Sequence, residues 1–352
     1  MKNVKILETT LRDGSYAVNF SFTSADTAAI CKELEEVGFE FIEIGHGVGL
    51  NASNTGHGQA AQTDEEYMIA AKNSLKKAKY GMFCIPGIAR IEDIDLAAKH
   101  QMGFIRIGTN VTEVEQSEPF IKKAKSYGMF VAANYMKSYG LPPEQFAQKV
   151  KLSEKYGADM VYIVDSAGGM LPEDLKKYYE EIRKISTIPV GFHGHDNLSL
   201  AVSNSLLAAD IGINFIDSSL QGLGRSAGNA STEILVAALL KKRYNIPINF
   251  LELLKIGQKY IQPLIVNKGI LPLDIISGYA DFHSSYMHHI QKYSAKYNVS
   301  PEILIIEQCK LDKINLDEKE LENVAKKIKS EEDIYLSQYR FNRYIGHEQD
   351  KL

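Results

Sequence analysis

Apolar positions along the chain follow two alternating patterns. Short apolar runs rich in β-branched and aromatic residues are each followed by a longer segment with helical spacing of its apolar positions. The runs predict eight strands, near residues 4–9, 39–45, 80–85, 103–108, 129–134, 160–165, 189–193 and 214–218. The intervening pattern predicts eight helices, at Ser24–Val37 with Ser24 as its cap, Asp64–Ala78, Ile91–His100, Ser117–Tyr127, Pro143–Tyr156, Pro172–Ser186, Ser199–Ile211 and Ser231–Arg243.

This repeat of strand and helix predicts the fold class. Eight such units close most economically into an α/β fold of the (β/α)8 TIM barrel type, whose C-terminal loops carry chemistry. A doubly wound open sheet is the alternative, but no Gly-x-Gly-x-x-Gly motif follows the first strand. After residue 245 the pattern predicts helices only, at Phe250–Ile261, Ile276–Tyr297, Pro301–Cys309 and Glu318–Lys329. We therefore predict a barrel domain over 1–245 and a helical C-terminal domain over 246–352.

The composition and charge of the chain exclude some classes of binding partner. The formal net charge is −4 and no run of Lys or Arg stands out, so we expect no nucleic-acid partner. No apolar stretch approaches membrane-spanning length, and the N-terminus enters a strand-like run without a signal core, which predicts a cytoplasmic protein without membrane contact. Cys31, Cys84 and Cys309 are far apart and form no CxxC pair, so we expect buried free thiols.

Two motifs at distant positions predict a divalent-metal site. Thr10-Leu11-Arg12-Asp13-Gly14 follows the first predicted strand, and His193-Gly194-His195 closes the seventh. Residues two apart on a strand share a face, so both imidazoles can bind one ion. Two imidazoles and the Asp13 carboxylate, with positions left for water and substrate, suit a catalytic ion better than a closed structural site. The alternative for Arg12 and Asp13 alone is a surface ion pair.

Other polar residues fall at the same predicted mouth of the barrel. Glu43 and His46 follow the second strand and are candidates for substrate binding or for orienting a metal ligand. A buried ion pair between Glu43 and Arg12 is the alternative for Glu43. Asp165 and Ser166 end the sixth strand and are candidates for contact with a substrate carboxylate. A loop with three glycines follows the eighth strand and supplies a carbonyl oxygen from Asn229.

In combination, these motifs resemble the metal-dependent pyruvate aldolases of the 4-hydroxy-2-oxovalerate aldolase type, in the superfamily of 3-hydroxy-3-methylglutaryl-CoA lyase and isopropylmalate synthase. The similarity extends from Val4 to Val299. Its motifs are Thr10-Leu11-Arg12-Asp13-Gly14, Glu43-Ile44-Gly45-His46-Gly47, Pro86-Gly87-Ile88, Val164-Asp165-Ser166, Gly191-Phe192-His193-Gly194-His195, and Gly222-Leu223-Gly224 through Gly228-Asn229.

The resemblance implies a barrel with a helical C-terminal domain and a class II aldolase reaction. Mn²⁺, or a similar ion such as Mg²⁺, Co²⁺ or Zn²⁺, would bind Asp13, His193 and His195, with Asn229 completing the set. Arg12 would lie beside the bound oxoacid. A 4-hydroxy-2-oxoacid would chelate the metal, a base would remove its 4-hydroxyl proton, and cleavage would give an aldehyde and pyruvate through a metal-stabilised enolate.

The base is where the chain departs from the family pattern. Tyr16 stands where the aldolases have a histidine, four residues after the motif arginine, and His283 stands at the family's tyrosine position. Since unperturbed pKa values are about 6.5 for His and about 10 for Tyr, we hypothesise that His283 is the base and that Tyr16 positions the hydroxyl. Val48 and Asn110 replace an acidic residue and a histidine at the rim that would recognise the aldehyde half.

Two other functions stay open from the sequence. One is a lyase or synthase acting on an acyl-CoA or a sugar-like oxoacid with the same enolate chemistry. The other is a non-catalytic barrel that binds a metal or an oxoacid. The resemblance also implies an acylating aldehyde dehydrogenase as a partner of the C-terminal helices, and the size of the barrel suggests a homo-oligomer.

Overall fold

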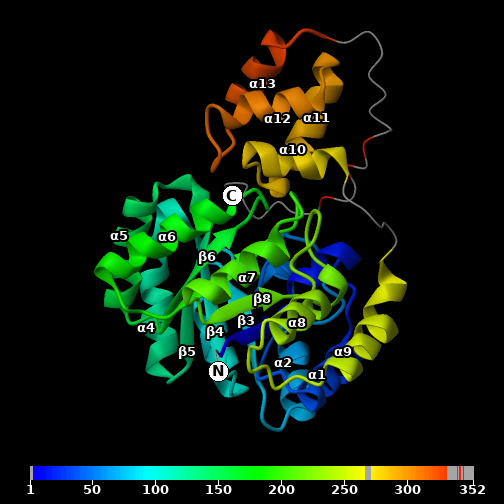
Figure 1. The fold of residues 1–352 in the computed structure, drawn as a ribbon. Helices are drawn as coiled ribbons and strands as arrows, with labels where there is room; N and C mark the ends of the chain where they lie inside the picture. Colours follow the sequence, from blue (N-terminus) through cyan, green and yellow to red (C-terminus); the bar gives the residue numbers. More distant parts are fainter. Residues whose placement is uncertain (1–2, 266–270, 331–338, 340, 342–343, 345–352) are drawn as a thin grey trace.

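The computed structural model describes residues 3–265, 271–330, 339, 341 and 344. Its parallel strands close into a barrel in chain order, because β1 forms hydrogen bonds with both β2 and β8 (Figure 1). This confirms the predicted barrel. The strands are β1 (Lys5–Glu8), β2 (Phe41–Glu43), β3 (Lys79–Cys84), β4 (Phe104–Asn110), β5 (Phe130–Met136), β6 (Met160–Asp165), β7 (Val190–Gly194) and β8 (Phe215–Ser218).

The helices that follow these strands surround the barrel (Figure 1). Their buried apolar residues belong to one core with those of the strands. They are α1 (Ser24–Val37), α2 (Asp64–Ser74), α3 (Ile91–Lys99), α4 (Glu118–Ser126), α5 (Pro143–Tyr156), α6 (Pro172–Ile185), α7 (Ala201–Ile211) and α8 (Thr232–Lys241). The cap of α1 is Thr23 and not the predicted Ser24. The Thr23 hydroxyl accepts from the Asp26 N–H, and the Asp26 carboxylate accepts from the Thr23 N–H, which forms a capping box.

The barrel interior changes from apolar to charged along its axis. An apolar cluster that includes Leu7, Phe104 and Met160 packs inside the strands, with the rings of Phe41 and Phe215 against it. Arg106 also points into this interior and is 1% exposed, with its guanidinium over the ring of Tyr162 at 4.7 Å. A buried guanidinium needs charged partners, so the polar end of the barrel must contain carboxylates.

The chain beyond the barrel repeat divides into two parts. Helix α9 (Phe250–Ile256) packs on α1 and α8, and its Leu253 and Ile256 belong to the same apolar core as the barrel. A separate apolar core joins α10 (Pro272–Ala280), α11 (Met287–Tyr297), α12 (Pro301–Cys309) and α13 (Glu318–Lys327). The two cores therefore divide between Ile261 and Leu273. A domain boundary at residue 245 stays a prediction, and these contacts favour a later one.

The prediction of one helix from Ile276 to Tyr297 is wrong. The structure ends α10 at Ala280, where Asp281 adopts a left-handed backbone conformation with φ of 56°. A short turn, Ser284–Tyr286, precedes α11. His283 accepts a hydrogen bond from the Ser285 N–H at the start of that turn. Because of this interruption, His283 lies in a turn and not on the surface of a helix.

The helices α10 to α13 form a domain over the carboxyl ends of the strands (Figure 1). The Asn197 side chain donates to the carbonyl oxygen of Asp274 at 3.1 Å, and Arg225 donates to the Ser284 hydroxyl at 2.8 Å. Both contacts join a barrel loop to the second domain. The mouth of the barrel is therefore covered by the C-terminal helices.

The structure bears on two expectations that were drawn from the composition. Cys31, Cys84 and Cys309 are free and buried, as predicted, and burial raises the pKa of each thiol. Among the described residues, every helix falls short of the length and apolar character that a membrane crossing requires.

Candidate metal centre and active site

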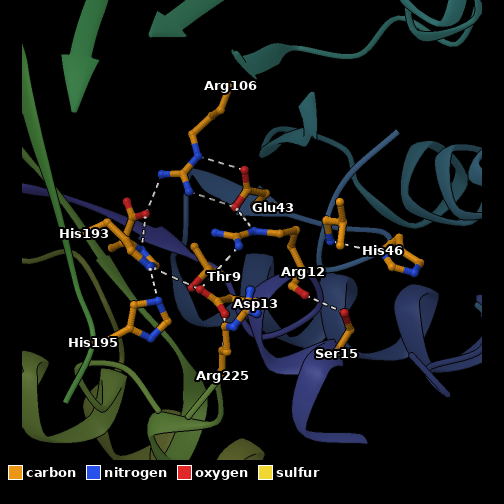
Figure 2. A network of polar contacts seen from close by, with 12 residues as sticks. Thr9, Arg12, Asp13, Ser15, Glu43, His46, Arg106, His193, His195 and Arg225 are labelled. Carbon is orange, nitrogen blue, oxygen red and sulfur yellow. Dashed lines mark hydrogen bonds and ion pairs between the residues drawn. The ribbon is translucent and has the colours of Figure 1, made fainter. Parts of the chain in front are cut away.

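Three buried side chains converge at the carboxyl ends of β1 and β7. Asp13 follows β1, His193 lies in β7, and His195 comes directly after it. One ligand atom from each side chain lies within 4.8 Å of the others. His193 Nε2 is 3.2 Å from Asp13 Oδ2 and 3.4 Å from His195 Nε2 (Figure 2). The structure therefore brings together the three residues that the spacing predicts as metal ligands.

A second carboxylate orients His193. Its Nδ1 lies 2.9 Å from Asp217 Oδ2, and Asp217 projects from the neighbouring strand β8. Because Asp217 occupies Nδ1, the opposite nitrogen faces Asp13 and His195. An imidazole held in this way by a carboxylate is typical of histidines that bind catalytic metals.

The electrostatics of Asp13 and His195 suit a cation. At His193, burial alone would lower the pKa, but the Asp13 and Asp217 carboxylates outweigh it and raise that pKa, so this imidazole would release its proton on binding an ion. Burial alone would raise the pKa of Asp13, but Arg12 and the two imidazoles outweigh it and hold that pKa well below its usual range. Burial lowers the pKa of His195 to about 4, so this imidazole is neutral near pH 7. An ionised carboxylate and a neutral imidazole are the states in which these groups bind a divalent ion.

Asn229 adds a fourth candidate ligand, and its surroundings explain the glycines of its loop. It forms a backbone bridge with His195, and its N–H donates to the carbonyl of Gly222 at 3.0 Å. A Cβ on Gly224 would lie 2.5 Å from Asn229 Nδ2, so only glycine fits there. The Asn229 amide is buried, and neither its oxygen nor its nitrogen has a hydrogen-bond partner among the described residues. A buried amide in this state fits a position that a bound cation completes.

Two of the metal-ligand candidates, Asp13 and His193, belong to a closed circuit of ion pairs and hydrogen bonds (Figure 2). Arg12 Nε donates to Glu43 Oε2 at 2.7 Å, and Arg106 Nε donates to Glu43 Oε1 at 2.8 Å. Arg106 continues to Asp217, and Arg12 returns to Asp13 at 3.3 Å. In order, the members of this ion-pair ring are Arg12, Glu43, Arg106, Asp217, His193 and Asp13.

Arg106 and Asp217 are functional residues that the sequence reasoning missed. Each lies in a strand that was predicted correctly, Arg106 in β4 and Asp217 in β8. The sequence could have pointed to both, because a charged residue within a largely apolar strand is buried and requires a buried partner of opposite charge. Glu43 meets one of its two predicted alternatives, the buried pair with Arg12, and extends it to Arg106.

Tyr16 and His283 border a common residue, Arg225, from the loop after β8. The Arg225 guanidinium lies 4.8 Å from the centre of the Tyr16 ring, and its Nε donates to the hydroxyl of Ser284, the neighbour of His283. Both candidates are buried. Burial raises the pKa of Tyr16, which keeps the phenol protonated. A Cβ on Gly47 would lie 2.6 Å from the Tyr16 ring, so the motif glycine leaves room for that ring.

His283 is held by its own turn. Its Nδ1 lies 2.7 Å from the Ser285 hydroxyl, while Nε2 has no partner among the described residues. Burial lowers its pKa well below the usual value, and Arg225, Lys137 and His195 lower it further. The imidazole is therefore neutral near pH 7, with one nitrogen left to meet another group.

The remaining predicted site residues make contacts within their own loops. His46 Nε2 lies 3.0 Å from the Gly58 carbonyl, Nδ1 accepts from the Val48 N–H, and the ring stacks on Phe20. These contacts shape the loop after β2, and burial lowers the pKa of His46 to about 4. Contact between His46 and a substrate stays a prediction.

Asp165 and Ser166 likewise fasten loops at the mouth. The Asp165 carboxylate accepts from the N–H groups of Gly169 and Met170, and burial raises its pKa to about 7. The Ser166 hydroxyl accepts from the Lys137 N–H at 2.9 Å. At the rim, the Asn110 amide donates to Glu113 at 3.1 Å. Substrate contact by Asp165 and Ser166 also stays a prediction.

A family model described as HMGL-like matches residues 3–259. That span is most of the chain and contains every member of the metal centre. The chain belongs to the HMGL-like family.

Relatives of this HMGL-like protein point to carbon–carbon lyases. The 4-hydroxy-2-oxovalerate aldolase of Carboxydothermus hydrogenoformans is 38% identical over 329 residues, which are 92% of this chain and 97% of that protein. The oxaloacetate decarboxylase of Mycobacterium tuberculosis is 38% identical over 306 residues, 87% of this chain and 90% of that protein. Both names describe lyases, in agreement with the predicted enzyme class.

A solved structure shows the same fold at lower similarity. The hydroxymethylglutaryl-CoA lyase of Bacillus subtilis superposes with a TM-score of 0.66 at 19% identity, covering 77% of this chain and 96% of that one. At this identity the likeness supports the HMGL-like barrel alone.

Proposed function

We propose that this protein is a divalent-metal-dependent aldolase that cleaves a 4-hydroxy-2-oxoacid to pyruvate and an aldehyde. The observation that carries the proposal is the convergence of Asp13, His193 and His195 beside Arg12, at a mouth that His283 covers. The name of the Carboxydothermus relative supports it, since the identity extends over nearly the whole length of both chains.

The donor set fits a divalent ion. Asp13, His193 and His195 would hold it, and the unpartnered Asn229 amide would complete the set. An ion there would act as a Lewis acid toward the 2-oxo group of the oxoacid.

The residues around this site have separate tasks in the proposed reaction. Arg12 is fixed by Glu43 and Asp13, so its positive charge is available where the 2-oxo oxygen becomes negative. His283, neutral near pH 7, removes the 4-hydroxyl proton through Nε2. The electrons of the O–H bond form the aldehyde carbonyl, the C3–C4 bond breaks, and the pair left on C3 accepts a proton to give pyruvate.

A second activity on oxaloacetate is favoured by one specific observation. The Mycobacterium relative named oxaloacetate decarboxylase is as identical to this chain as the aldolase is. Decarboxylation breaks a C3–C4 bond and leaves the same carbanion at C3, but its substrate has no 4-hydroxyl proton to remove. It therefore requires the metal side of the site and does not require the base.

The test is pyruvate release with each substrate. Purified protein is stripped with EDTA, reloaded with Mn²⁺, and given 4-hydroxy-2-oxovalerate or oxaloacetate in an assay coupled to lactate dehydrogenase. Metal-dependent pyruvate from the hydroxyacid supports the aldolase. Pyruvate from oxaloacetate alone rejects the aldolase in favour of the decarboxylase, and consumption of acetyl-CoA would point to a synthase instead.

We also propose the identity of the ion, the location of the protein and its partners. Mn²⁺ is the proposed ion because the family resemblance implies it, and a carboxylate and an amide oxygen beside two imidazoles are compatible with such an ion. A cytoplasmic location is proposed from the N-terminal sequence and the lack of long apolar stretches, an acylating aldehyde dehydrogenase partner from the family resemblance, and a homo-oligomer from the barrel size. Metal analysis, sedimentation and co-purification with such a dehydrogenase would test them separately.

A further inference from the structure

The turn that carries His283 is fastened to the barrel by a buried lysine. Lys137 follows β5, and its amine donates to the Tyr286 hydroxyl at 3.2 Å and to the carbonyl of Ile314. The same amine lies 4.8 Å from the centre of the Tyr286 ring. The Tyr286 hydroxyl also donates to Ile314 at 3.0 Å. One barrel side chain therefore joins two segments of the C-terminal domain.

Arg225 fastens the same turn from the opposite side of the mouth. Its Nε donates to the Ser284 hydroxyl at 2.8 Å, and its backbone N–H lies 3.5 Å from Asp13 Oδ1. Lys137 follows β5 and Arg225 follows β8, so the two contacts come from separate strands. His283 lies in the segment between Phe282 and Tyr286 that both cations reach.

Packing alone does not explain why the amine of Lys137 is buried. Its side chain is fully buried, and among the described residues the carboxylates that act on it, Asp312 and Glu113, do so from beyond ion-pair distance. Its acceptors are two neutral oxygens, although burying an ammonium group is costly without a charged partner. Its backbone is left-handed, with φ of 55°. A non-glycine residue in that conformation carries strain that is most often found at functional sites.

We propose that Lys137 and Arg225 are positioning residues that clamp the turn from His283 to Tyr286 over the metal centre, so that His283 meets the substrate. This rests on the proposed function, because it concerns the residue assigned as the base. The clamp acts from the barrel on a domain that would otherwise be joined to it near the mouth by contacts such as that of Asn197 with Asp274.

The clamp also has an electrostatic consequence for His283. The charged and titratable groups that face this imidazole are Arg225 from the loop after β8, Lys137 from the loop after β5, His195 from the end of β7 and Asp13 after β1. Beyond burial, the first three lower the pKa of His283, and Asp13 raises it. Removal of the Lys137 charge should therefore raise the pKa of His283. A lysine that only stabilises the fold, too far from His283 for its charge to act there, would leave that pKa unchanged.

The experiment compares variants of the full-length Mn²⁺ protein. Lys137→Met keeps the stem and removes the amine, Lys137→Arg restores a cation, and Tyr286→Phe removes the hydroxyl acceptor. Lys125→Met is the matched control, because Lys125 pairs with Asp159 away from the centre. The measurements are kcat and KM for aldol cleavage from about pH 5 to about pH 9, Mn²⁺ affinity by electron paramagnetic resonance, and the pKa of His283 by NMR on the same variants loaded with diamagnetic Mg²⁺.

For Lys137→Met we expect kcat to fall about 30-fold, because small displacements of a catalytic group have effects of this size. The pKa of His283 should rise by about one unit, Mn²⁺ affinity should hold, and Lys137→Arg should recover part of both effects. Tyr286→Phe should lower kcat and leave the pKa of His283 in place, since the charge is retained.

Specific outcomes overturn the clamp. They are a wild-type kcat and an unmoved His283 pKa in Lys137→Met, an equal loss in Lys125→Met, or a parallel loss of Mn²⁺ affinity. If Lys137→Met does not fold, Tyr286→Phe and Ser284→Ala replace it in the test. Tyr286→Phe removes the partner of Lys137, and Ser284→Ala removes the partner of Arg225. A wild-type kcat in both variants overturns the clamp. Absence of aldol cleavage in the wild type rejects the proposed function, and the NMR pKa then still decides for or against the clamp.

Discussion

The two sides of the barrel mouth are built in different ways. On the metal side, ligand candidates project from strand ends, and the ion-pair ring from Arg12 to Asp217 fixes them within one domain. On the base side, His283 belongs to a turn of a second domain, and contacts with Lys137 and Arg225 hold it across the boundary. The comparison teaches that the ion site can be preformed by the barrel, while the proton-transfer group depends on how two domains meet.

Removal of a metal ligand should have the largest effect, because both activities need the metal side. For Asp13→Asn we expect loss of Mn²⁺ binding and a fall in turnover of about 10³-fold or more with either substrate. Mn²⁺ binding is measured by electron paramagnetic resonance and turnover by pyruvate release. Near-normal turnover in this variant would remove Asp13 from the metal centre.

Removal of the base should affect aldol cleavage and spare the functions of the metal side. For His283→Ala we expect aldol cleavage to fall about 10²-fold to 10⁴-fold, while Mn²⁺ binding and oxaloacetate decarboxylation change little. The reason is that only the hydroxyacid has a proton for His283 to remove. The background from free Mn²⁺ is set with Asp13→Asn protein at the same metal concentration. If aldol cleavage persists, His283 is not the base and Tyr16 becomes the next candidate.

Breaking the ion-pair ring should weaken the metal side without abolishing it. In Asp217→Asn, His193 loses its orienting carboxylate, so we expect Mn²⁺ affinity to fall about 10-fold to 100-fold. Arg106 keeps only Glu43, and the free energy of unfolding should drop by about 3 kcal/mol.

The matched control is Glu40→Gln, which breaks the exposed pair with Lys5. This change should lower the free energy of unfolding by less than about 1 kcal/mol. Equal urea midpoints for the two variants would show that the ring is not a source of stability.

The buried Lys137 on the base side should make the free energy of unfolding depend on pH. Burial lowers the pKa of Lys137 to about 7, whereas a lysine in the unfolded chain titrates near about 10.4. Between these values the unfolded chain binds more protons than the folded one, so the stability of the wild type rises with pH across this window. Relative to Lys137→Met, the wild type should gain about 3 kcal/mol from about pH 7 to about pH 10. Parallel stability curves for the two proteins would contradict the lowered pKa of Lys137.

The sequence predicted the metal side far better than the base side, for a physical reason. The strands and most helices follow from local periodicity, and Asp13, His193 and His195 follow from their places at strand ends. Parallel strands put such residues at one edge, so local signals are enough.

The base side depends on contacts between segments far apart in the chain. Gly278 precedes the break by three residues and lies within α10, and neither Gly nor Pro stands at Asp281 itself, so the pattern predicts a continuous helix there. Lys137 carries no local sign that it would meet Tyr286, 149 residues away. Arg106 and Asp217 lie between these extremes, because each was visible as a lone charge in an apolar strand.

The account depends most directly on where a divalent ion binds. Crystals grown with Mn²⁺ and oxalate, which mimics the chelating end of an oxoacid, would locate the ion by anomalous scattering. We predict one strong peak bounded by Asp13, His193, His195 and Asn229, with oxalate within reach of Arg12. A peak elsewhere, or none at this mouth under saturating Mn²⁺, would contradict the metal centre and the proposed reaction with it.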